Sequence, residues 1–142
     1  MIKKLTHFSD LHIRLFKDHD LYRDIIRDML SRFEQIKPDR ILFTGDLVHS
    51  KNQMTPELIE IVAWVLTECS KIAKTILIPG NHDFLVNNTE RLDALSPIIN
   101  SLNSENIVNN VETKKTFSGE TTSINKGNYS IQDMPNAPIL NE

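Results

Sequence analysis

The chain has 142 residues, of which 39% are hydrophobic and 25% are charged, and this balance is typical of a soluble globular protein with one core. Its formal net charge is -3, which excludes a general positive field that would draw the whole surface onto nucleic acid. Cys69 is the only cysteine and no apolar run approaches the ~20 residues of a membrane-spanning helix, so we expect a cytoplasmic protein with no membrane partner.

The first part of the chain alternates apolar segments of two kinds. Residues 5–8 and 40–44 are short runs rich in Leu, Ile, Phe and Thr that end in polar clusters, which is typical of buried strands. Between them, the apolar side chains of residues 21–33 recur at about every helical turn. We therefore expect an amphipathic helix there, ended by Pro38.

The next helix is expected to begin at Thr55, whose hydroxyl can cap the first turn, with Pro56 at the first helical position. Its apolar residues follow the i, i+3, i+4, i+7 spacing as far as Cys69. Residues 75–78 form another short apolar run, closed by Pro79 and Gly80, and are predicted to be a further buried strand.

A third helix is predicted from about residue 91 to residue 102, with Pro97 shortening or kinking it. From residue 113 onward large apolar residues become sparse, and the chain is rich in Ser, Thr and Asn. We therefore divide the chain into the N-terminal part of a domain, residues 1–112, and a weakly structured tail or stump of a missing second half, residues 113–142.

The order strand, helix, strand, helix, strand, helix predicts an α/β fold: a largely parallel sheet with flanking helices, followed by an irregular C-terminal tail. In such sheets ligands bind outside the carboxyl ends of the strands. A polar cluster follows each predicted strand, so we expect clusters that are far apart in sequence to be neighbours in space.

The first cluster is Asp10-Leu11-His12, which alone could be a turn aspartate and a surface histidine. The second is Gly45-Asp46, an ordinary turn pair when taken alone. The third, Gly80-Asn81-His82-Asp83, combines a tight turn with an amide oxygen, an imidazole and a carboxylate. Together they predict a metal centre, because a cation relieves the repulsion between crowded carboxylates. The mixture of ligands suits Mn²⁺, Fe or Zn²⁺ better than Ca²⁺.

These motifs, each after a strand, resemble those of the calcineurin-like metallophosphoesterase superfamily, and the resemblance covers roughly residues 1–111. It implies that the chain forms half of the superfamily's two-sheet sandwich. His49, which follows Asp46 in Gly-Asp-Leu-Val-His, resembles the double-strand-break repair exonuclease branch. Asn87-Asn88 and residues 91–97 are similar to viral and phage members of the SbcD-type nuclease subunits, which would place the protein in a host cytoplasm.

The resemblance implies a set of metal ligands. Asp10 and His12 would hold a first ion, Asp46 would bridge both ions, and Asn81 would hold the second through its side-chain oxygen. Two divalent ions about 3.5–4 Å apart can clamp a phosphodiester and activate a hydroxide for in-line attack. Mn²⁺ is the expected metal, with Fe, Zn²⁺ or Mg²⁺ as alternatives.

The resemblance also implies catalytic roles. His82 would stabilise the scissile phosphate and protonate the leaving oxygen, His49 would contact the phosphate or support a ligand, and Asp83 would orient His82. The family completes its site with a further His and a Gly-His-x-His motif, but none of the five histidines lies beyond His82. The chain is therefore expected to be a fragment, to take the missing ligands from a partner, or to be inactive.

The resemblance implies a metal-dependent nuclease that acts at DNA ends, with DNA as substrate and a long coiled-coil ATPase subunit as partner. A phosphatase or cyclic-nucleotide phosphodiesterase is the first alternative, although His49 and residues 91–97 favour the nuclease. A non-catalytic remnant that binds another protein is the second, supported by the missing histidines. Half a sandwich would leave one sheet face open, so we also expect exposed apolar surface and a tendency to associate, a homodimer included.

Overall fold

The computed structural model describes residues 1–84 and 91–109. Within these ranges the elements are, in chain order, β1 (Leu5–Phe8), α1 (His19–Ile36), β2 (Arg40–Phe43), α2 (Pro56–Ile72), β3 (Lys74–Leu77), α3 (Ser96–Leu102) and β4 (Ile107–Asn109). The predicted α/β fold is confirmed. The predicted tail, residues 113–142, and the pair Asn87-Asn88 lie outside the described residues, and the division after residue 112 stays a prediction.

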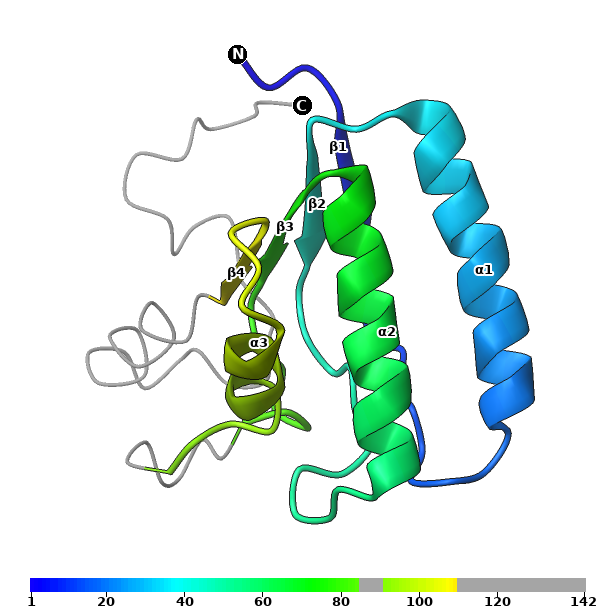
Figure 1. The fold of residues 1–142 in the computed structure, drawn as a ribbon, viewed down its shortest axis with the longest axis vertical. Helices are drawn as coiled ribbons and strands as arrows, with labels where there is room; N and C mark the ends of the chain where they lie inside the picture. The colour runs from blue at the N-terminus through cyan, green and yellow to red at the C-terminus, as the bar shows by residue number, and fades with distance from the viewer. Residues whose placement is uncertain (85–90, 110–142) are drawn as a thin grey trace, which may run out of the picture.

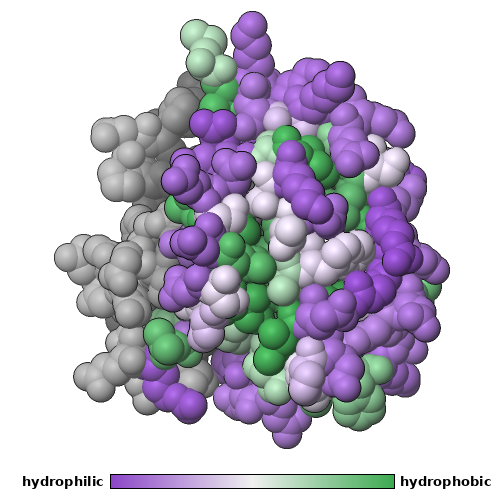
Figure 2. Space-filling view, viewed as in Figure 1, coloured by the Kyte–Doolittle hydropathy of each residue, from purple (hydrophilic) through white to green (hydrophobic). Residues whose placement is uncertain are grey.

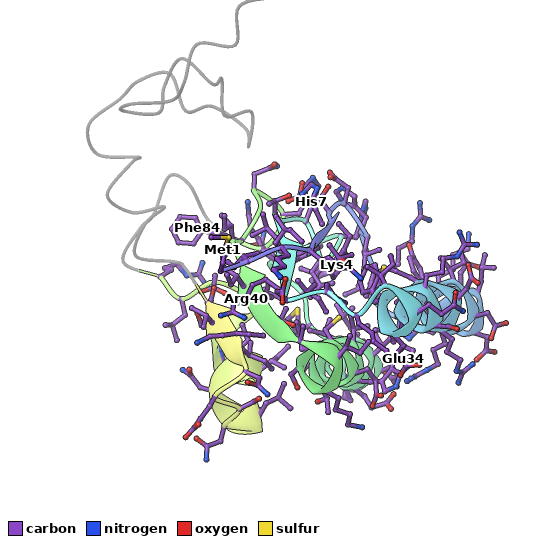
Figure 3. All side chains as sticks on the ribbon, turned by 90° about the horizontal axis from the view of Figure 1, so that it is seen from above. Met1, Lys4, His7, Glu34, Arg40 and Phe84 are labelled. Carbon is purple, nitrogen blue, oxygen red and sulfur yellow. The ribbon has the colours of Figure 1, made fainter. Side chains whose placement is uncertain are left out.

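The strands form one parallel sheet in the order β1-β2-β3-β4. Each connection therefore moves in the same direction across the sheet, and right-handed crossovers then place their helices on the same face. Figures 1 and 3 show α1, α2 and α3 on that face. The strand β4 was not predicted, because three residues are too few to give an alternating pattern.

The core lies between this face and the helices. In β2, Ile41 and Phe43 are buried, whereas Arg40 and Leu42, which alternate with them, are only half-buried. The helix α2 has more buried residues than the other helices, and Cys69 is one of them. Burial raises the pKa of the Cys69 thiol to about 12, so this cysteine is an unreactive small hydrophobe. Figure 2 shows the outer side of the helices, which is largely hydrophilic around a central hydrophobic strip.

The first two predicted helices are confirmed, although not every apolar side chain of the first one is buried. The N-cap prediction for α2 holds, because Thr55 Oγ1 accepts the N–H of Leu58 at 3.2 Å. In α1, the buried row is Ile26, Leu30 and Phe33. Leu21 and Ile25 are 60% and 56% exposed, since the row that contains them faces away from α2 and the sheet.

The predicted start of the third helix, at about residue 91, is wrong, because α3 begins at Ser96. The side chain of Asp93 accepts the N–H groups of Leu95 (2.8 Å) and Ser96 (2.7 Å), which holds the preceding turn. Pro97 lies in the first helical turn, where a missing N–H removes no helical hydrogen bond. This proline therefore fits the first turn of the helix and does not kink it.

No described helix covers the opposite face of the sheet, which carries His7 (Figure 3). Leu5 and Val108 are 56% and 38% exposed there, and Leu42 and Ile76 are half-buried. The expected exposed apolar surface is therefore confirmed for the described residues, whereas association stays a prediction. Among the described helices, none combines the length and the apolar character needed to cross a membrane.

Candidate metal centre

The loops that follow β1, β2 and β3 leave the same edge of the sheet (Figure 1). A backbone ladder joins the first two, because the N–H of Asp10 donates to the Gly45 carbonyl and that of His12 to the Asp46 carbonyl, both at 2.9 Å. The ladder continues the parallel pairing beyond the strands as far as the bridge between Ile13 and Val48. It brings the first and second polar clusters side by side, as the sequence predicted.

Two glycines allow the loops after β2 and β3 to touch. A Cβ atom at Gly45 would lie 2.6 Å from the Cα of Gly80, and one at Gly80 would overlap the Asp46 carboxylate. Gly45 also has a φ of 113°, in the region that favours glycine. The glycine of each motif is therefore required by close packing, so that Asp46 lies against the third cluster.

The carboxylate of Asp83 fastens these loops together. Asp83 is fully buried and accepts the N–H groups of Asp46 (2.7 Å), Leu47 (3.3 Å), Val48 (3.0 Å) and Gly80 (2.9 Å). Burial raises the pKa of Asp83 above its ordinary value, and the N–H donors oppose that shift. The carboxylate thus acts on the backbone that carries the candidate ligands.

The orientation of His82 comes from a different group than we predicted. Its Nδ1 lies 2.6 Å from the carbonyl oxygen of His49, and its backbone N–H donates to Asp46 Oδ1 at 2.8 Å. The prediction that Asp83 orients His82 is therefore replaced by a carbonyl contact, with Asp83 holding the loops beneath it. A carbonyl oxygen only accepts, so the proton of the neutral ring lies on Nδ1.

Asp10, His12 and Asp46 form one group of candidate ligands. Nε2 of His12 lies 3.7 Å from Asp10 Oδ1 and 3.9 Å from Asp46 Oδ2. One ligand atom from each of the three residues fits within 4.8 Å of the others. The Asp46 side chain is 14% exposed and that of Asp10 is 65% exposed, so the group opens to solvent on the side of Asp10.

His12 also belongs to a group of three histidines with His49 and His82, whose ligand nitrogens lie within 4.8 Å of one another. The His12 and His82 ring centroids are 4.6 Å apart and nearly perpendicular, and the ring of His49 is 5.9 Å and 5.8 Å from them. The structure thus brings both predicted catalytic histidines to the predicted ligands. Asn81 is half-buried in the same loop as His82.

Sequence reasoning missed Lys51. Its Nζ donates to the backbone carbonyls of Asn81 (2.6 Å) and Phe84 (3.2 Å), so it holds the third loop from the side of the second. A lysine shortly after the second motif fits no ligand pattern. Only the folded geometry, in which the two loops lie side by side, reveals this contact.

The backbone of the site is strained. Asp10, His12 and Asp46 have φ values of 58°, 47° and 60°, a left-handed conformation that residues other than glycine seldom adopt. Such conformations cost of order 1–3 kcal/mol each and cluster at functional sites, where the surrounding structure holds them. All three candidate ligands of the first group share this feature, and the loop ladder and Asp83 hold it in place.

The donor set fits a divalent metal ion. Carboxylates and imidazoles are the ligands that Mn²⁺, Fe and Zn²⁺ accept together. In addition, Nδ1 of His12 is buried and has no hydrogen-bond partner within the described part of the chain. Buried polar atoms normally have a hydrogen-bond partner. A bound metal ion, or a molecule that the ion coordinates, would give the His12 ring the partner that it lacks.

The structure is thus an α/β protein with a candidate metal site, made of carboxylate and imidazole donors, at the carboxyl ends of its parallel strands. A sequence profile of calcineurin-like phosphoesterases matches residues 3–141. The chain therefore belongs to the calcineurin-like phosphoesterase family, whose members are metal-dependent hydrolases. The superfamily predicted from the motifs is confirmed.

The chain is also similar to a viral protein. Over 101 residues, which are 69% of this chain, it is 44% identical to a protein of Acanthamoeba polyphaga mimivirus with the name "Uncharacterized protein R555". The match covers 8% of that relative's length, so it extends only to a small part of the viral protein. The name of this relative states no activity, so the match leaves the substrate open.

Proposed function

We propose that this chain belongs to a nuclease that hydrolyses phosphodiester bonds at DNA ends with two divalent metal ions, preferably Mn²⁺. The observation that carries the proposal is the group of Asp10, His12 and Asp46 as candidate ligands, with His49 and His82, the proposed catalytic residues, gathered beside His12. Family membership supports phosphoester hydrolysis in general. His49 and the resemblance to SbcD-type subunits favour DNA over small phosphoesters and suggest a coiled-coil ATPase partner.

Asp10, His12, Asp46 and Asn81 would hold the ions, with Asp46 between the two positions. When bound, the ions would supply Lewis-acid activation of the phosphodiester and of the attacking water. Asp46 suits the central position because its side chain is the more buried of the two carboxylates and its Oδ1 is fixed by the His82 N–H. Asp10, which is more exposed, would complete the outer side of the site.

His82 would act as the general acid. Its Nδ1–H is engaged by the His49 carbonyl, so Nε2 is the atom that takes up and releases a proton. In the protonated ring, Nε2–H would donate to the leaving oxygen and the positive charge would stabilise the phosphate. The exposed ring of His49 lies beside that of His82, and His49 would also contact the phosphate.

The test is Mn²⁺-dependent cleavage of linear double-stranded DNA, with bis(p-nitrophenyl) phosphate assayed in parallel. We expect Asp46→Ala to reduce cleavage to background and His82→Ala to reduce it by about 10²- to 10⁴-fold. Asp39→Ala is the matched control for Asp46→Ala, because it makes the same substitution at the amino ends of the strands. It should cleave as the wild type does.

Other outcomes identify the alternatives. Hydrolysis of the small phosphodiester without cleavage of DNA would indicate a phosphatase or cyclic-nucleotide phosphodiesterase. Activity of the wild type no higher than that of Asp46→Ala on either substrate would indicate a non-catalytic remnant, in line with the absence of histidines beyond His82.

A further inference from the structure

An open hollow of about 370 Å³ lies beside the candidate metal centre. The loop between β1 and α1 contributes Arg14, Phe16 and Lys17 to its lining, and the loop between β2 and α2 contributes His49 and Gln53. Because His49 also belongs to the histidine group, the hollow is continuous with the candidate site. Its volume falls within the roughly 300–1,000 Å³ of small-ligand clefts.

The lining of this hollow combines an exposed aromatic side chain, Phe16, with two residues that carry cations, Arg14 and Lys17. Phe16 is 73% exposed, although phenylalanine is usually buried. Arg14 and Lys17 make no ion pair with an acidic side chain within residues 1–84 and 91–109. Their charges are therefore free to meet an anion. Proteins bind single-stranded nucleic acid in this way, with a base stacked on an aromatic ring and cations beside the phosphates.

Phe16 does not serve the core. The neighbouring Leu15 packs against the core, whereas Phe16 is absent from that cluster. An exposed phenylalanine gains little free energy from folding, because its apolar surface stays in water. Packing in the core therefore does not account for an aromatic residue at this position.

The segment around Phe16 is fixed before any ligand arrives. Nε2 of His19 donates to the Arg14 carbonyl, and Thr55 Oγ1 donates to the Leu15 carbonyl, both at 2.5 Å. Helices α1 and α2 thus hold the backbone on the N-terminal side of Phe16. A ring on a fixed backbone loses less conformational entropy on binding than one on a loose loop.

We propose that Phe16, with Arg14 and Lys17 beside it, is a stacking subsite for an unpaired nucleobase of the DNA strand whose phosphate lies at the metal centre. This inference rests on the proposed function and names its substrate class: a base can stack on Phe16 only when its face is free. The chain therefore prefers single-stranded or frayed DNA ends to fully paired ones.

The test compares two fluorescent oligonucleotides of equal length and charge, one with bases and one with abasic residues. Both carry phosphorothioate linkages to resist hydrolysis, and their dissociation constants are measured by anisotropy in Mn²⁺. The wild type should bind the base-bearing strand about 5- to 150-fold more tightly, the range for one base stacked on an aromatic ring. Phe16→Ala should bring this ratio close to one, and Phe16→Tyr should preserve it.

Two further variants sharpen the assignment. Arg14→Gln and Lys17→Gln should weaken both strands equally and lower the salt dependence of binding, because they act on phosphates. Ile36→Ala, an exposed apolar residue at the far end of α1, is the matched control and should leave the ratio unchanged. The melting temperature of Phe16→Ala should equal that of the wild type, which excludes misfolding as the cause.

The proposed subsite would be wrong if Phe16→Ala left the ratio of the two dissociation constants unchanged. It would also be wrong if the wild type bound the base-bearing and abasic strands equally well. Cleavage is read separately with Asp46→Ala. If DNA is cleaved and cleavage depends on Asp46, but Phe16→Ala does not change the binding ratio, the subsite is wrong and the nuclease proposal stands. A Phe16-dependent preference in a chain that does not cleave DNA would remove the nuclease and leave a DNA-binding subsite.

Discussion

At the amino ends of the strands, Asp39 accepts the N–H groups of Lys3 (2.7 Å) and Lys4 (2.8 Å), and at the carboxyl ends Asp83 accepts those of the ligand-bearing loops. The hydrogen bonds are of the same kind, but the environments are opposite. Backbone hydrogen bonds lower the pKa of the exposed Asp39, whereas burial raises that of Asp83. Water can replace the exposed carboxylate of Asp39 as an acceptor but cannot reach the buried N–H groups that Asp83 accepts, so the carboxyl edge depends more on its carboxylate.

Residues in the left-handed conformation show the same contrast. Lys37 and Asn103 end α1 and α3, the usual place for this conformation, and Asp18 precedes α1. Asp10, His12 and Asp46 adopt it with no helix to begin or end. The left-handed backbone at the carboxyl edge therefore sets where the side chains of the candidate ligands lie. Its conformational cost must be offset by the hydrogen bonds of Asp83 and by the ladder between the first two loops.

The largest expected effect follows from removing Asp83. In Asp83→Ala, buried N–H groups on both loops lose their acceptor, and we expect the free energy of unfolding to fall by about 3–5 kcal/mol. Urea denaturation measures this loss, with Asp39→Ala as the matched control at the opposite edge. A loss no larger than that of Asp39→Ala would show that the two edges are held equally well.

Gly80→Ala should have a smaller effect on stability and a specific effect on the site. Its Cβ would overlap the Asp46 carboxylate and lie 2.3 Å from the Asp46 backbone nitrogen, so the loop must shift. We expect a loss of about 1–3 kcal/mol, as for other overpacked positions, together with weaker metal binding. Calorimetric titration with Mn²⁺ checks the second part, and unchanged binding would mean that the close approach of the loops is not needed.

The smallest expected effect is that of Asp39→Ala. Because the folded pKa of Asp39 is lowered, its ionised form stabilises the fold above the ordinary value of 3.8, and this contribution is lost as the pH falls through the folded pKa. We expect a slightly lower melting temperature than the wild type at pH 7 and no difference below the folded pKa. A difference that grows on acidification would contradict the assigned direction.

The sequence predicted the elements with strong local signals. Thr55 and Pro56 mark the start of α2, and the polar clusters after the strands identified Asp10, His12 and Asp46, which the structure brings together. The strand β4 was missed, because three residues show no period and its pairing with β3 decides its conformation. The start of α3 was misplaced, because the contacts of Asp93 hold the preceding turn.

The supporting parts of the site were beyond sequence reasoning for a related physical reason. The position of Asp83 beneath two loops, the hydrogen bonds of Lys51 and the contact between Gly45 and Gly80 all depend on how loops far apart in sequence meet. A motif identifies the residue types that a metal accepts. It does not show which backbone groups hold them in position.

The central claim is that the carboxyl edge of the sheet binds divalent metal through Asp46. The most direct measurement is the electron paramagnetic resonance signal of free Mn²⁺, titrated with wild type, Asp46→Ala and Asp39→Ala. Our account predicts that the wild type and Asp39→Ala deplete the signal equally and that Asp46→Ala leaves it close to that of buffer. Equal depletion by all three proteins, or none by the wild type, would contradict it.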